Sequence, residues 1–216
     1  GEANAVAIRI ARASTKKQNI AFCGYHGWHD WYLSSNLNNS KNLDKHLMSN
    51  LKFKGVVKQL KNTSFPFLYN DFKGLKKLVT QKKIGIIKME VCRNILPKDN
   101  FLKKIRNLCN EKKIILIFDE CTSGFRETLG GKHLDFNINP DIAIFGKAIG
   151  NGYAINAVLG KEKFMKNFNQ TFISSTFWTE RIGPTAALKT IEVMTNIKSW
   201  QTINKIGNKI RKRWDE

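Results

Sequence analysis

Three short apolar runs in this sequence each end on residues that could do chemistry. They lead into a Tyr-His pair, an aspartate and a lysine, which are Tyr25, His26, Asp119 and Lys147. An amine can attack a carbonyl carbon, a carboxylate can pair with a cation, and an aromatic ring can stack on a planar ligand. Ligands of an open α/β sheet bind at the carboxyl ends of its strands, so we expect these side chains to converge on one edge. A helix that opens at Gly1 is expected to offer N–H groups to an anion on the same edge.

Each of these residues also has a simpler interpretation. Asp119 is typical of a turn or a helix cap after a strand, and Lys147 is typical of a solvated loop. Tyr25 would then be ordinary packing, and His26 a hydrogen-bonded loop residue. The glycines around Lys147 do not form GxxxxGK[ST], so a nucleotide P-loop is not supported. The order of the four signals along the chain is more informative than any one of them.

The elements that must position these residues alternate along the chain. Continuous β-branched or aromatic runs at 114–118 and 142–145 are expected of strands buried on both faces. Further strands are expected at 19–23, 84–90 and 153–159, and helices at 1–12, 71–80, 100–110, 185–195 and 199–214. Strands that alternate with helices of about ten residues predict an α/β fold with a mostly parallel central sheet.

The charge of the chain raises a different class of function. It carries 37 basic and 17 acidic residues, a formal net charge of +20. Such an excess is typical of nucleic-acid partners, but the lysines are scattered, and the densest stretch, 205–214, is typical of one helix face. We therefore expect no nucleic-acid partner and keep a non-catalytic, nucleic-acid-binding protein as the alternative. Salt-sensitive binding to duplex DNA, with no bound chromophore, would favour that alternative.

Cysteine and histidine spacing argues against disulfides and metals. No CxxC pair or regular framework exists among the four cysteines, which are Cys23, Cys92, Cys109 and Cys121. His26 and His29 lie beside Asp30, but no further ligand is spaced to complete a metal site. No apolar run approaches the roughly eighteen residues of a membrane span. We expect a protein of the reducing cytoplasm, without metal or membrane.

Several longer motifs make a family resemblance specific. Among them are LIFDECTSGFR at 116–126, NPDIAIFGKAIGNG at 139–152 and STFWTERIGP at 175–184, preceded by GEANAVAIRIAR, GYHGWHD and YND. In this order they resemble the class III aminotransferases of pyridoxal-phosphate (PLP) fold type I, a group that also contains glutamate-1-semialdehyde aminomutase. The resemblance implies the α/β large domain of that fold, with PLP as cofactor.

The resemblance also implies roles for single residues. Lys147 would hold PLP as a Schiff base and act as general base and acid. Asp119 would pair with the protonated pyridine nitrogen. Tyr25 would stack on the ring with His26 beside it, and Cys121 would pack against the opposite face.

Three further residues follow from the same resemblance. Gly1 matches the end of the turn that binds the cofactor phosphate. Thr176 matches a threonine that reaches the phosphate of the neighbouring subunit, which implies a homodimer with shared active sites. Glu90 would lie behind the cofactor contacts, with a plain surface glutamate as the alternative.

Domain organisation and reaction are implied in the same way. Residues 1–184 would form the PLP-binding large-domain core, and 185–216 would be helices that lead to a C-terminal small domain. The chain would cover roughly half of a full-length member, without its N-terminal segment and small domain. The implied reaction moves an amino group between a small-molecule amino donor and a keto acid or aldehyde. The alternative is intramolecular amino transfer of the glutamate-1-semialdehyde aminomutase type.

Overall fold

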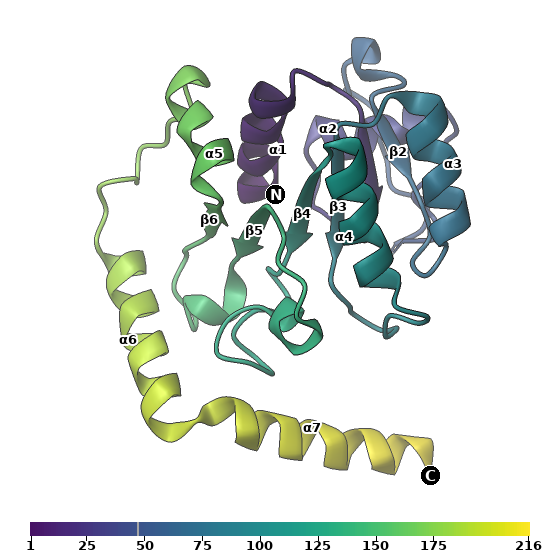
Figure 1. Ribbon diagram of the computed structural model, residues 1–216. Helices are drawn as coiled ribbons and strands as arrows, with labels where there is room; N and C mark the ends of the chain where they lie inside the picture. The colour runs from purple at the N-terminus through teal and green to yellow at the C-terminus, as the bar shows by residue number, and fades with distance from the viewer. Residues whose placement is uncertain (47) are drawn as a thin grey trace.

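A central sheet of six strands organises the chain in the computed structural model, which describes residues 1–46 and 48–216 (Figure 1). The strand order is β2-β1-β3-β4-β5-β6. The strands are β1 (Ile20–Cys23), β2 (Ser64–Pro66), β3 (Ile86–Glu90), β4 (Ile115–Asp119), β5 (Ile142–Phe145) and β6 (Ala157–Gly160). The first five pair in parallel, and β6 runs antiparallel to β5. The predicted α/β class with a mostly parallel sheet is confirmed.

Helices connect the strands. The α-helices are α1 (Glu2–Thr15), α2 (Asp30–Leu33), α3 (Phe72–Lys82), α4 (Phe101–Lys112), α5 (Glu162–Met165), α6 (Ile182–Ile197) and α7 (Ser199–Asp215). Short 3₁₀ turns are η1 (Ser34–Leu37), η2 (Lys58–Leu60), η3 (Lys132–Phe136), η4 (Lys147–Ile149) and η5 (Lys166–Gln170). All five predicted helices are present, with ends that differ by a few residues. The strand expected at 153–159 is the shorter β6.

The sheet separates two layers of apolar packing because successive strand residues face opposite sides. Ile86 and Ile117 pack with α1 on one face. Ile87 and Leu116 pack with α3 and α4 on the other face, and Figure 1 shows these helices on opposite sides of the sheet. Glu90 and Asp119 are paired in register at the carboxyl ends of β3 and β4. This pairing places two carboxylates side by side at the edge where the site was predicted.

The last two helices pack far less than the rest. Figure 1 shows α7 as an arm that runs along one end of the molecule to the C-terminus. No residue of α7 is buried, and α6 buries only Gly183, Ala187 and Met194. No helix in the described part of the chain is long and apolar enough to cross a membrane.

Candidate active site

The strand ends bring His26 and Asp119 into direct contact. His26 lies in the loop after β1, and Asp119 is the last residue of β4. The Nδ1 atom of His26 is 2.8 Å from Oδ2 of Asp119, and Nε2 is 3.0 Å from the carbonyl oxygen of Cys23. Both side chains are almost fully buried, at 0% and 4% exposure. The convergence predicted for these two residues is confirmed.

A third charged residue, which was not predicted from the sequence, contacts Asp119 as well. Lys88 on β3 donates from Nζ to the same Oδ2 of Asp119 at 3.1 Å, and its side chain is fully buried. The backbone N–H of Cys121 donates to the other oxygen, Oδ1, at 3.2 Å. Burial opposes ionisation of Asp119, but the Lys88 ammonium and the contact with His26 outweigh it. The pKa of Asp119 therefore lies well below its usual value.

Lys147 begins the 3₁₀ turn η4, close after the end of β5. Its backbone has a conformation that residues other than glycine rarely adopt. Its φ is 50°, in the left-handed region that residues at helix ends of this chain, such as Lys16 and Lys83, also adopt. The side chain is exposed, and its amine donates to Oγ1 of Thr122 at 2.9 Å. The amine is therefore accessible. The hydrogen bond to Thr122, three residues after Asp119, fixes its position.

A chain of hydrogen bonds links this threonine to the Tyr25 segment. Arg93 donates from Nη2 to Thr122 Oγ1 at 3.2 Å and also to Glu90. Glu90 Oε2 accepts from the backbone N–H of Tyr25 at 3.3 Å. Burial raises the pKa of Glu90, although Arg93 opposes the shift. Glu90 is only 9% exposed, so the plain surface interpretation of this residue is wrong.

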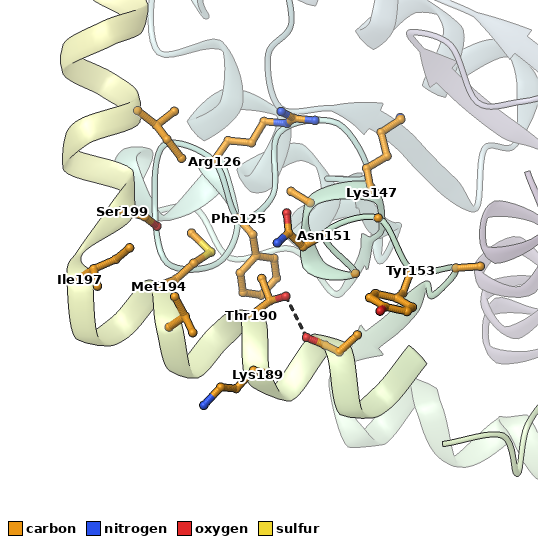
Figure 2. Close-up of a pocket in the computed structure, with 17 residues that line it drawn as sticks. Phe125, Arg126, Lys147, Asn151, Tyr153, Lys189, Thr190, Met194, Ile197 and Ser199 are labelled. Carbon is orange, nitrogen blue, oxygen red and sulfur yellow. Dashed lines mark hydrogen bonds between the residues drawn. The ribbon is translucent and has the colours of Figure 1, made fainter. Parts of the chain in front are cut away.

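An open cavity of about 1000 Å³ lies between the Lys147 turn and α6. Figure 2 shows Lys147 and Arg126 at this cavity, with Met194 and Ile197 of α6 also lining it. Tyr25, His26 and Asp119 do not line it. The cavity is therefore lined by Lys147 and not by Asp119. The Asp119 carboxylate is buried at the end of β4.

The predicted anion-binding end of α1 lies close to the loop after β1. Gly1 is the N-cap of α1. The position that a Cβ would take on Gly27 is 2.8 Å from Gly1 Cα, and φ of Gly27 is 94°. Only glycine fits such a close approach, so the free N–H groups of α1 are held beside the Tyr25–His26 loop.

Thr176 lies on the exposed segment before α6, away from the hydrogen-bonded cluster. Its neighbours Ser175 and Phe177 line a second cavity of about 420 Å³ together with Glu2 and Ala3. The segment thus approaches the start of α1 of its own chain. An experiment must therefore distinguish whether Thr176 contributes to the cofactor site of its own subunit or to that of a partner subunit.

One buried histidine, His26, and one half-buried histidine, His46, make stability depend on pH. Burial lowers the pKa of both His26 and His46 to about 4, and the Lys88 ammonium adds to the effect on His26. An unfolded histidine titrates near 6.5, so between about pH 6.5 and 4 the unfolded chain binds more protons than the folded chain. Stability must then fall as the pH falls through this window.

We expect the free energy of unfolding of the full-length apoprotein to drop by about 2 kcal/mol per histidine between pH 7 and 5. Urea unfolding at the two pH values measures the drop. His46→Asn offers an oxygen in place of the Nδ1 atom that accepts the Gly24 N–H at 3.1 Å. Between pH 7 and 5 the free energy of unfolding of this variant should fall by about 2 kcal/mol less than that of the wild type. An unchanged fall would contradict the assignment.

Comparison with known proteins supports one family over the whole chain. The family model described as "Aminotransferase class-III" matches residues 1–216. A 3-aminobutyryl-CoA aminotransferase of Cloacimonas acidaminovorans is 36% identical over 96% of this chain and 48% of its own length. A glutamate-1-semialdehyde 2,1-aminomutase of Nitrosopumilus maritimus is 37% identical over 97% of this chain and 49% of its own length. The chain thus spans about half the length of these curated relatives.

A solved structure shares the fold. The omega-transaminase from Sphaerobacter thermophilus superposes with a TM-score of 0.77 at 24% identity, over 89% of this chain and 47% of that one. At this identity the likeness establishes the fold alone, which agrees with the α/β architecture described above.

Proposed function

This chain belongs to the class III aminotransferases, and on that premise we propose that its protein is a PLP-dependent aminotransferase. The observation that best supports this function is the joint placement of Lys147 after β5 and of the ion-paired Asp119 at the end of β4. The reaction would move an amino group between a small-molecule amino donor and a keto acid or aldehyde.

The residues present fit PLP in the chemistry of their donors and acceptors. A carboxylate has about four acceptor positions. Asp119 has three filled, by His26 and Lys88 on Oδ2 and by the Cys121 N–H on Oδ1. One position stays open for the protonated ring nitrogen of PLP. Lys147 supplies an exposed amine for the aldehyde carbon, and the N–H groups after Gly1 suit a phosphate.

The chain's own groups then have distinct tasks. When bound, PLP supplies an electron sink for the carbon that loses its proton. Lys147 takes and returns that proton at Nζ, and Thr122 positions this atom through their hydrogen bond. Tyr25 would pack on the ring of the bound cofactor. Glu90 holds the Tyr25 backbone in place.

His26 and Cys121 border the same carboxylate. The His26 ring lies beside Asp119 and fixes its orientation. Cys121 is next to the Lys147 turn, because a Cβ on Gly146 would lie 3.4 Å from its Sγ atom. We assign Cys121 to the face of the cofactor opposite Tyr25, where its small polarisable side chain fills space.

We further propose a homodimer in which Thr176 contacts the cofactor phosphate of the partner subunit. A dianionic phosphate needs several donors, and the N–H groups at Gly1 provide only some of them. A mixed dimer of Lys147→Ala and Thr176→Ala subunits tests this. If Thr176 acts in trans, the Thr176→Ala subunit keeps its own Lys147 and borrows an intact Thr176, so its PLP affinity and activity stay near normal.

The opposite result is equally specific. If Thr176 serves its own chain, the one site that retains Lys147 in the mixed dimer lacks the hydroxyl. The PLP affinity measured by titration should then fall to that of the Thr176→Ala homodimer. This would reject the shared site and leave the Lys147 assignment standing.

Domain organisation and location complete the proposal. Residues 1–184 form the cofactor-binding core, and 185–216 lead into a further small domain. The large exposed apolar side chains of α6 and α7, such as Leu188, Ile197 and Trp214, support this division. Four free cysteines support a location in the reducing cytoplasm.

A second candidate is intramolecular amino transfer of the aminomutase type, favoured by the relative that is 37% identical. The full-length protein should therefore be incubated with PLP, an amino acid donor and an external keto acid. Net transfer to the keto acid, lost on removal of PLP, supports the aminotransferase. Isomerisation of an amino aldehyde without net transfer supports the aminomutase, and salt-sensitive DNA binding without bound PLP would support neither.

A further inference from the structure

Lys88 is a fully buried lysine in a strand position that packing alone would fill with an apolar residue. Its side-chain exposure is 0%, and its register neighbours on β1 and β4 are Phe22 and Ile117. Burial of an ammonium costs several kcal/mol unless a counter-ion compensates it. The counter-ion here is Asp119, whose Oδ2 is 3.1 Å from Nζ. The charge of Lys88 therefore acts on the carboxylate at the centre of the site.

The His26 ring shows what this charge does. Its two nitrogens face two acceptors, Asp119 Oδ2 at 2.8 Å and the Cys23 carbonyl at 3.0 Å. A ring between two acceptors is fully satisfied only as the imidazolium, which has two N–H groups. Burial and the Lys88 ammonium nevertheless lower the pKa of His26 to about 4. Burial is the larger cause, and Lys88 adds to it against the two acceptors, which favour the protonated ring.

The titratable groups around Lys88 act against the effect of its burial. Burial lowers the pKa of Lys88, whereas Asp119, Cys121 and Glu90 all favour its charged form. Glu90 is itself paired with Arg93. Since His26 and Lys88 fill Oδ2 and the Cys121 N–H takes one position on Oδ1, the open acceptor position is on Oδ1.

We propose that Lys88 is a positioning residue of the cofactor site, which keeps Asp119 ionised and His26 uncharged and leaves Oδ1 for the cofactor's ring nitrogen. The cofactor part of this inference rests on the proposed function. The charge relation among Lys88, His26 and Asp119 does not, because it belongs to the chain alone.

The first test is the titration of His26 in the full-length apoprotein, followed by NMR of ¹⁵N-labelled histidine. His26→Asn identifies the signal. In the wild type the ring should stay neutral from pH 5.5 to 8. In Lys88→Met it should titrate at least about two pH units higher than in the wild type, because the charge that repels the proton is gone.

A control removes a lysine–aspartate ion pair elsewhere. Lys161 donates from Nζ to Asp141 at 2.7 Å, and Asp141 is 4% exposed, as Asp119 is, although Lys161 itself is 46% exposed. Lys161→Met should leave the His26 titration unchanged. A structural effect common to any lost lysine–aspartate pair would shift the His26 titration in both variants.

The second test uses PLP itself. A protonated His26 competes with a cationic ring nitrogen for Asp119, so PLP should bind Lys88→Met relatively less well at low pH. The ratio of dissociation constants, Lys88→Met over wild type, should fall at least about twofold from pH 6 to 9, because a ring that titrates near pH 6 is half protonated at pH 6 and neutral at pH 9. The ratio for Lys161→Met should stay constant.

The outcomes separate this inference from the proposed function. A wild-type protein that does not bind PLP rejects the function, and the apoprotein titration still decides the role of Lys88. Normal PLP binding with the same His26 titration in wild type and Lys88→Met rejects the role of Lys88 alone. If Lys88→Met does not fold, Lys88→Gln replaces it, and a wild-type His26 that titrates near 6.5 overturns the inference without any variant.

Discussion

A full-length chain that carries Lys147→Ala is expected to lose amino transfer by roughly 10⁴-fold, yet still to bind PLP without a covalent bond. The substitution removes the amine that would bond to the cofactor aldehyde and move the substrate proton. It leaves Asp119 with its three donors and leaves the N–H groups at the start of α1. Catalysis should therefore fall much further than affinity.

Borohydride reduction followed by peptide mass mapping measures the covalent bond directly. In the wild type the pyridoxyl group should be found on Lys147. Lys189 is the matched control, because it lines the same cavity and its amine pairs with the exposed Glu192. Lys189→Ala should retain both labelling and transfer, and a pyridoxyl group on any other lysine would reject the assignment.

The elements with strong local signals were predictable from the sequence. The run 142–145 coincides with β5, because continuous β-branched and aromatic residues suit a strand buried on both faces. The predicted helix at 71–80 appears as α3, and Asp71 caps it by accepting the Gly74 N–H at 2.8 Å. In both cases the residues that determine the element lie within it.

The strand β2 was not predicted, because its residues give little local signal. Ser64–Pro66 is three residues long and contains a proline, which is disfavoured within a strand. It exists as an edge strand that pairs in parallel with β1, more than forty residues earlier in the chain. Such a pairing depends on tertiary contacts that no local pattern reports.

The site was predictable to the extent that strand ends define it. The rule that ligands bind at carboxyl ends of parallel strands predicted that His26 and Asp119 would meet, and they do. Thr122 and Arg93 were missed, because their contacts depend on how loops fold after the strands end. The spacing of residues in the sequence does not predict such loop contacts.

Lys88 was missed for a different reason, and a signal for it existed. Residues 86, 88 and 90 share one face of β3, and a strand was predicted at 84–90. A lysine at the centre of a strand covered on both faces must be buried, and it then requires a counter-ion. Asp119 at the end of a strand was one candidate for that counter-ion, but the order of the strands was not predicted, so the pairing of β3 with β4 became known only from the structure.

The same pairing determines what a change at Asp119 should do. We expect Asp119→Asn to reduce amino transfer by roughly a hundredfold or more, since charge-assisted contacts in such sites are worth a few kcal/mol. Asparagine keeps the shape but removes the negative charge that would hold the ring nitrogen protonated. It also leaves the Lys88 ammonium without its counter-ion, so the free energy of unfolding should fall as well.

Asp141→Asn separates these two effects. Asp141 is 4% exposed, like Asp119, and it binds Arg106 at 3.0 Å and Lys161 at 2.7 Å, outside the site. Its replacement should lower stability in urea unfolding and leave the rate per folded, PLP-loaded subunit unchanged. Asp119→Asn should lower that rate even when the subunits are folded and loaded. Near-normal turnover in Asp119→Asn would mean that this carboxylate serves only to neutralise Lys88 at the end of β4.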